Sequence, residues 1–294
     1  MRTMKRKPIK ISVFEVIIFV VLAIFSIVLL TLFFWGFISS FRNHFGVTEE
    51  PFKLFDGLTI KNYESLFKDF YYISDRKKFT IYDLFGNSFL YSIGGALAQT
   101  FATAVMAYCT AKYPGKVSLF IYYMVIVVTI LPIVGNLASM IMVTNFLKIY
   151  NTLPGIWIMK FGFCNVYYFI FYAAFKKIPW DYAEAAFIDG ANHFRVFFTI
   201  MLPLVGTLFG TVFLLNFIVY WNDFETPYMF LKAHPTASVG LYALLNNLMV
   251  PTKLANSVPV ILGAAFTVFI PILILFLCVR NKIMGNLTDG GIKG

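Results

Sequence analysis

Histidine and cysteine are the side chains that most often bind metals or act as bases and nucleophiles, and this sequence has three of each. The histidines lie far apart, no H-E-x-x-H sequence occurs, and the cysteine spacings match neither a metal knuckle nor a disulfide framework. A nucleotide-binding loop would read G-x-x-x-x-G-K-[ST], but the nearest fragment, Gly115-Lys116, is followed by Val117. We therefore expect this chain to be no enzyme and to hold neither metal nor cofactor. The six residues are His44, His193, His234, Cys109, Cys164 and Cys278.

The composition indicates a membrane protein. Sixty percent of the residues are hydrophobic, only 13% are charged, and the mean hydropathy is +0.78, which is more apolar surface than a soluble domain of this length buries. The net charge of +10 comes from short basic clusters between apolar runs and not from one continuous basic face. We therefore expect the chain to lie in a lipid bilayer and not to bind nucleic acid.

Six apolar stretches reach the length of roughly 20 residues that a helix needs to cross a bilayer. We therefore expect an all-α polytopic membrane protein. The first stretch follows a basic cluster as in a signal peptide, but it is about twice the usual apolar length and lacks a clear cleavage site, so it is expected to be retained. The stretches are Val13 to Ser39, Leu84 to Cys109, Ser118 to Val143, Pro154 to Phe175, Leu204 to Phe224 and Val260 to Val279.

The distribution of Lys and Arg predicts the orientation. Five basic residues and no acidic residue precede the first stretch, and further Lys and Arg follow the second, fourth and sixth stretches. Because basic residues near helix ends favour the cytoplasm, both termini are predicted to be cytoplasmic. The region from Phe41 to Asp83 carries seven basic and seven acidic residues and is predicted to lie outside, as is the shorter segment Tyr228 to Pro259.

The loop between the fourth and fifth stretches, residues 176–203, contains its own helix signals. Pro179 can begin a helix, Asp181 and Glu184 suit its first turns, and Gly190 can supply a left-handed stop. A second helical segment then runs into Leu202 and Pro203, where the next crossing starts. The pattern predicts a helix-turn-helix elbow at the cytoplasmic surface.

The same loop reads Glu184-Ala185-Ala186, three residues, Gly190, nine residues, Ile200, one residue, Leu202-Pro203. This spacing resembles the EAA loop of ABC-type importer permeases. The resemblance implies that the loop is a coupling helix that docks into a cleft of a cytoplasmic ATPase subunit. The residues expected to couple to the ATPase are Glu184, Ala185, Ala186, Asp189, Gly190, Leu202 and Pro203.

Residues from about 84 to 294 resemble the carbohydrate branch of that family, the permeases of maltose-type importers. The similarity is carried by Trp221-Asn222-Asp223-Phe224, by Val239-Gly240-Leu241 and by the tail from Gly285 to Gly294. The resemblance implies an inner-membrane subunit of a prokaryote that forms half of a sugar path. Its implied partners are a second, similar permease, two ATPase subunits that bind ATP and Mg, and an extracytoplasmic sugar-binding protein.

Amide side chains in the apolar stretches could contact a sugar, although hydrogen bonding between helices is the more frequent role of such groups. The candidates are Asn87, Gln99, Asn136, Asn216 and Asn222. Two alternatives stay open, namely an importer of this superfamily for another solute and an ion-coupled secondary transporter. The second would need ionisable groups near the bilayer midplane, where the stretches are nearly free of charge.

The expected organisation is a single membrane domain with short flanking segments. It comprises a basic N-terminus 1–12, a first helix 13–39, an outer segment 40–83, a transmembrane domain 84–280 with the loop 176–203, and a cytoplasmic tail 281–294.

Overall fold

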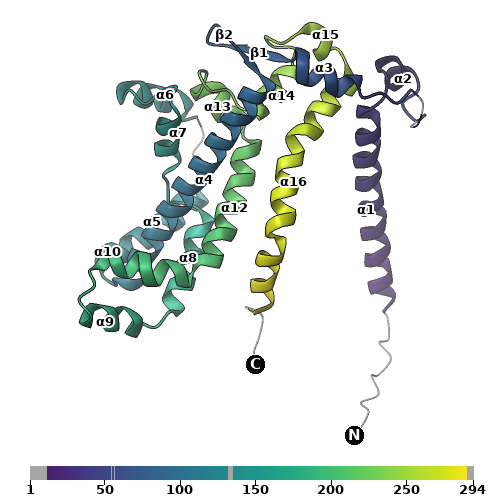
Figure 1. Cartoon of the computed structure of the whole chain (residues 1–294). Helices are drawn as coiled ribbons and strands as arrows, with labels where there is room; N and C mark the ends of the chain where they lie inside the picture. The colour runs from purple at the N-terminus through teal and green to yellow at the C-terminus, as the bar shows by residue number, and fades with distance from the viewer. Residues whose placement is uncertain (1–11, 54, 56, 132–134, 290–294) are drawn as a thin grey trace.

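The computed structural model describes residues 12–53, 55, 57–131 and 135–289, with side chains through residue 278. Helices account for most of these residues (Figure 1). The elements are α1 Val13–Ser40, α2 His44–Glu49, α3 Lys61–Asp69, β1 Tyr71–Ser74, β2 Lys77–Thr80, α4 Ile81–Lys112, α5 Lys116–Ile130, α6 Leu137–Phe146, α7 Leu153–Lys160, α8 Val166–Lys177, α9 Asp181–Ile188, α10 His193–Val196, the π-helical turn η1 Phe197–Met201, α11 Leu202–Leu204, α12 Gly206–Asn222, α13 Glu225–Phe230, α14 Ala237–Leu245, α15 Thr252–Ala255 and α16 Val258–Asp289.

Helix α4 is the central element of the bundle. Its first turn is closed by a capping box, in which the Asp83 carboxylate accepts hydrogen bonds of 2.8 Å from both the backbone N–H and the hydroxyl of Thr80. Small residues such as Ala96, Ala104 and Ala107 are completely buried along it. They let α7, α8, α12 and α14 pack closely against α4.

The buried side chains form two clusters at different levels of the bundle. One cluster, which we call the outer cluster because it lies toward the end of the molecule that carries β1 and β2 (Figure 1), joins Leu66 and Phe70 of the segment between α1 and α4 to Trp221 at the end of α12. The inner cluster joins Tyr108 of α4 and Phe171 of α8 to residues of the α9–α11 region. Helix α4 contributes to both clusters and so connects the two levels.

The third and fourth predicted crossings are each interrupted. Helix α5 ends at Ile130 because the next residue, Leu131, precedes Pro132 and takes the extended conformation (ψ 118°) that a following proline favours. The fourth stretch is divided into α7 and α8 by the non-helical residues 161–165.

Three helices in the described residues are long and apolar enough to cross a membrane, namely α1, α4 and α16 as far as Cys278. A fourth crossing results if the segments His193–Leu204 and Gly206–Asn222, which meet at a bend of 79°, are taken together. The count of six crossings stays a prediction.

Helix α1 lies apart from the bundle for most of its length (Figure 1). Its buried residues are confined to the outer end, where Gly36 lies against α16 and the Phe33 and Phe266 rings are 5.3 Å apart between centroids. Most of the remaining side chains of α1 are exposed and apolar, as expected for a helix whose neighbour is lipid or another membrane chain.

The two ends of the molecule differ in content. Figure 1 shows the hairpin of β1 and β2, α3, α14 and α15 at one end, which we call the outer end. It shows α9, α10, the start of α1 and the C-terminal end of α16 at the other, the inner end. Helix α16 continues to Asp289, whereas residues 1–11 of the predicted N-terminal segment and 290–294 of the predicted tail lie outside the described residues.

Candidate functional site

The helix-turn-helix predicted between the fourth and fifth stretches is present, and we call α9 through α11 the elbow. Helix α9 ends in a Schellman motif, in which the N–H of Gly190 donates to the carbonyl of Phe187 and the N–H of Ala191 donates to that of Ala186. Gly190 has a φ of +81°, a conformation that costs a residue with a Cβ energy. The prediction that Gly190 supplies a left-handed stop is confirmed.

The second arm of the elbow begins at Asn192, whose side-chain oxygen accepts a 2.8 Å hydrogen bond from the N–H of Arg195. It continues through α10, η1 and α11 to the 79° bend, where α12 begins. Pro203 is the second residue of α11 and lies directly before the bend. The second arm of the elbow therefore continues directly into α12.

The elbow is fastened to the inner end by a few contacts. The Tyr113 hydroxyl lies 2.8 Å from Nδ1 of His193, and the Lys112 ammonium donates to the carbonyl of Ile178. On α9 only Ala183 is completely buried. The opposite side of α9 is open to its surroundings.

The residues expected to couple to the ATPase lie mostly on this open side. Glu184, Ala185, Asp189 and Gly190 are exposed, Ala186 is half-buried, and Leu202 and Pro203 lie at the far end of the elbow beside the bend. Apolar neighbours are exposed as well, with Ile188 at 86% and Phe194 at 76%. No hydrogen bond or ion pair engages the Glu184 carboxylate within the described chain. The surface combines acidic groups with unpacked apolar side chains, as a protein-binding surface does.

Three of the five candidate amides are used in contacts between elements. Asn216 on α12 donates to Thr100 on α4 over 3.0 Å, Asn87 donates to the carbonyl of Pro235 over 3.0 Å, and Gln99 accepts from the Tyr220 hydroxyl. Asn222 is exposed and donates to its own helix at Ile218, and Asn136 is exposed before α6. The structure does not bring these five amides together.

Sequence reasoning missed a polar cluster at the outer end, centred on an ion pair between Lys160 and Asp223. The Lys160 ammonium lies 3.3 Å from Oδ2 of Asp223, and the two side chains are only 20% and 16% exposed. Tyr91 donates to the same carboxylate oxygen over 2.7 Å, and the N–H of Thr226 donates to Oδ1 over 3.0 Å. The pair thus joins α4, α7 and the start of α13.

Lys160 makes two further contacts. Its ammonium donates to the Thr226 hydroxyl over 3.2 Å and lies 4.7 Å from the centre of the Tyr220 ring. We call Lys160, Asp223, Tyr91, Tyr220 and Thr226 the polar hub. A sequence signal existed, because one Lys and one Asp of opposite charge stand at the ends of two stretches that are otherwise nearly free of charge.

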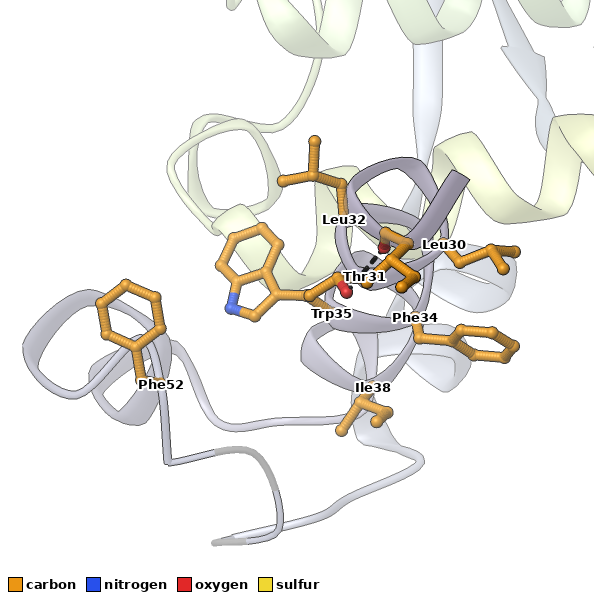
Figure 2. Close-up of a pocket in the computed structure, with 8 residues that line it drawn as sticks. Leu30, Thr31, Leu32, Phe34, Trp35, Ile38 and Phe52 are labelled. Atoms are coloured by element: carbon orange, nitrogen blue, oxygen red, sulfur yellow. Dashed lines mark hydrogen bonds between the residues drawn. The ribbon is translucent and has the colours of Figure 1, made fainter. Parts of the chain in front are cut away.

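A large hollow of about 680 Å³ opens beside the outer end of α1. Figure 2 shows the Trp35 side chain extending from α1 toward Phe52 in the loop after α2. Trp35 donates to the carbonyl of Pro51 over 2.8 Å, and the Thr31 hydroxyl donates to its own helix at Ile27. With these polar groups already engaged, the apolar walls offer little to a hydroxylated solute.

No group of three or more His, Cys, Asp and Glu in the described residues could hold a metal ion.

Comparison with known proteins shows to which family the chain belongs. Residues 99–281 match the family described as binding-protein-dependent transport system inner membrane component. The chain belongs to this family. Its members are the non-catalytic permease subunits of ABC importers, whose ATPase is a separate chain, so this chain is an inner-membrane permease of a prokaryote.

Curated relatives and a solved structure agree with this assignment. The chain is 26% identical over 212 residues to the arabinooligosaccharides transport system permease protein AraQ of Bacillus subtilis, covering 71% of this chain and 73% of the relative. It is 23% identical over 283 residues to the diacetylchitobiose uptake system permease protein NgcG of Streptomyces coelicolor, covering 95% and 89%.

The fold resembles a chain in the crystal structure of a bacterial ABC transporter involved in the import of the acidic polysaccharide alginate. The TM-score is 0.77 at 20% identity, and the match covers 94% of this permease and 99% of that chain. The likeness confirms a mostly helical ABC-permease fold.

Proposed function

We propose that this permease forms half of the translocation path of an ATP-driven sugar importer. The names of its relatives support a sugar as the solute, since they include permeases for arabinooligosaccharides, diacetylchitobiose and trehalose. In the assembly a second, similar permease completes the path. Two ATPase subunits bind ATP and Mg on the cytoplasmic side, and an extracytoplasmic binding protein delivers the sugar.

The observation that carries the proposal is the exposed elbow. Its spaced pattern, from Glu184 to Pro203, lies on a helix-turn-helix at the end of the molecule opposite the β-hairpin (Figure 1). In the proposed assembly the open side of α9 docks on an ATPase subunit, with Glu184 and Asp189 facing basic groups there. Both termini then lie in the cytoplasm, and the outer end faces the binding protein. Movement of the ATPases pushes the elbow and shifts the helices between inward and outward openings.

Seven residues of the elbow couple the permease to the ATPase, and the five amides are candidates for contact with the solute in the translocation path. The surface of Glu184, Ala185, Ala186, Asp189 and Gly190 makes the contact, and Leu202 and Pro203 transmit it to α12. Asn136 and Asn222 are the amides whose exposure suits contact with a passing solute, whereas Asn87, Gln99 and Asn216 mainly hold elements together.

The test is purification of the tagged permease from native membranes in a mild detergent, followed by mass spectrometry. Recovery of a second permease, an ATPase and a soluble binding protein is the expected result, with ATP hydrolysis stimulated by the sugar-loaded binding protein. Stimulation by a non-sugar solute instead would correct the solute. Uptake in vesicles that follows an ion gradient and ignores ATP would refute the importer.

A further inference from the structure

The β1–β2 hairpin at the outer end is held in a fixed position. Its two-residue turn, Asp75-Arg76, is left-handed at both positions, with φ of 48° and 60°, which is the geometry of a tight hairpin turn. An isolated two-stranded ribbon is marginally stable, but here the Tyr72 side chain is 93% buried. In addition, the N–H of Ile73 donates to Met249 over 3.0 Å. The turn is therefore presented by a rigid base.

The hairpin is also joined to the segment that follows α13. The Ser74 hydroxyl donates to the backbone carbonyl of Lys232 over 2.8 Å, although the two residues are 158 positions apart. This bond places Lys232 beside the strand that leads into the turn. We call Arg76, Lys77, Lys78 and Lys232 the basic platform, and all four side chains are exposed.

Few acidic groups balance the platform. The segment Tyr228 to Pro259 contains Lys232 and Lys253 and no Asp or Glu. The hairpin, residues 71–80, contains three basic residues and one acidic residue, Asp75. Asp69 and Asp83 flank the hairpin at its base, separated from the turn by the length of the strands. No hydrogen bond or ion pair engages the charged groups of Arg76, Lys77 or Lys232 within the described residues.

The remaining basic residues nearby are arranged differently. Lys68 on α3 pairs with Glu64 at 2.6 Å, and Lys53 in the loop after α2 pairs with Glu50 at 2.9 Å. Lys78 belongs to the platform but its ammonium lies over the Tyr71 ring at 4.6 Å, which holds it at the hairpin surface. Lys61, Lys148 and Lys253 are exposed single charges on other elements, whereas the platform brings four exposed basic side chains together.

Positive charge at this place opposes a general tendency, because basic residues are normally enriched on the cytoplasmic side of a membrane protein. On the proposed orientation the platform lies on the other side. Its charges stand on and beside the hairpin at the outer end (Figure 1), where a soluble, negatively charged partner can reach them.

We propose that the basic platform is an electrostatic landing surface for an acidic patch on the extracytoplasmic binding protein. This inference rests on the proposed function. A binding protein must arrive quickly and leave after delivery, and exposed charges speed association without creating a permanent apolar interface. The hairpin contacts α4, the central helix of the bundle, and so directs the partner to the permease core.

The test measures ATP hydrolysis of the complete complex in lipid nanodiscs against the concentration of its sugar-loaded binding protein, identified by the purification above and produced separately. In the variant Lys77→Glu/Lys232→Glu, the half-saturating concentration is expected to rise at least tenfold at low salt, with the maximal rate unchanged. The difference is expected to shrink as salt is added. The control is Lys61→Glu, which reverses the charge of an exposed residue on α3. It is expected to change the half-saturating concentration less than twofold.

The possible failures are distinguishable. Equal half-saturating concentrations in the wild-type complex and the variant would overturn the landing surface and leave the importer intact. A defect that appears only in nanodiscs with anionic lipid, and not in zwitterionic phosphatidylcholine, would assign the platform to lipid and overturn the inference. A wild-type complex that no binding protein stimulates would refute the proposed function and this inference with it.

Discussion

At the outer end the Asp223 carboxylate interacts with Lys160, Tyr91 and Thr226, whereas at the inner end the carboxylates of Glu184 and Asp189 engage no group in the described residues. The hub is largely buried and the elbow largely exposed. A buried charged group needs a partner within the chain, because an unpaired charge in a protein interior is energetically costly. A solvent-exposed charged group needs no such partner and can pair with a group on another chain. The contrast indicates that the hub stabilises this subunit, and it supports the proposed docking of the elbow on another chain.

The largest expected effect comes from breaking the hub. Lys160→Met keeps most of the apolar part of the side chain but leaves the Asp223 carboxylate buried without its cation, which is expected to cost about 3 kcal/mol of unfolding free energy. The measurement is the unfolding temperature of the purified permease in detergent. Lys148→Met, at an exposed position, is the control and should leave that temperature unchanged. Adding Asp223→Asn should restore part of the loss, and equal temperatures for Lys160→Met and wild type would show that the ion pair adds no stability.

A second change tests the packing beside the hub. A Cβ on Gly94 of α4 would stand 2.1 Å from the Trp157 ring of α7, so Gly94→Ala must displace that ring and is expected to cost about 2 kcal/mol. Gly86→Ala on the same helix meets nothing within 4 Å and is the matched control. Thermal unfolding compares the two. If both variants unfold alike, α7 moves away from α4 more freely than the packing implies.

At the inner end we expect an effect on function more than on stability. Gly190→Val places a β-branched residue at a φ of +81° and strains the turn by about 1 to 2 kcal/mol. The permease should still insert into the membrane. ATP hydrolysis should no longer drive uptake, because the strained turn changes the orientation of the open side of α9 relative to the ATPase subunit. Gly210→Val on α12 has open space and serves as the control. Normal uptake by the Gly190 variant would argue against ATPase docking at the elbow.

The smallest effect concerns the inner core between these regions. Tyr168 on α8 donates to the Thr110 hydroxyl on α4 over 2.7 Å, and Thr110 donates in turn to its own helix. Tyr168→Phe removes one hydrogen bond and should cost about 1 kcal/mol. Tyr123→Phe, at a ring that is 57% exposed, should cost nothing measurable in the same unfolding experiment. A cost as large as that of Lys160→Met would mean that the inner end depends on buried polar bonds as much as the hub does.

The parts of the structure that the sequence predicts well are governed by neighbouring residues. Pro179, Asp181 and Gly190 act on the backbone within a turn of themselves, so the elbow was predictable before its surroundings were known. The membrane character of α1, α4 and α16 likewise follows from long, mainly apolar runs that are nearly free of charge. The interruption between α5 and α6 had a local signal too, in Pro132, which outweighs the apolar character of the predicted stretch.

The parts that were missed depend on distant residues. Lys160 and Asp223 are 63 positions apart, and each alone looked like a charge at a helix end. Their pairing follows only from the fold that brings α7 to the end of α12. The hairpin was missed for a related reason, since its strands have four residues each and Asp75-Arg76 lacks the glycine that usually marks such a turn. Its position depends on bonds to Lys232 and Met249, far along the chain.

The 79° bend between the elbow and α12 has a mechanical consequence. When the elbow is displaced along the axis of its second arm, the component directed along α12 is the cosine of 79°, about one fifth of the motion. Nearly all of the displacement is therefore perpendicular to α12, and a helix pushed sideways at one end tilts about its contacts further along. In the proposed assembly the bend would therefore act as a crank, which converts a push along the second arm of the elbow into a tilt of α12.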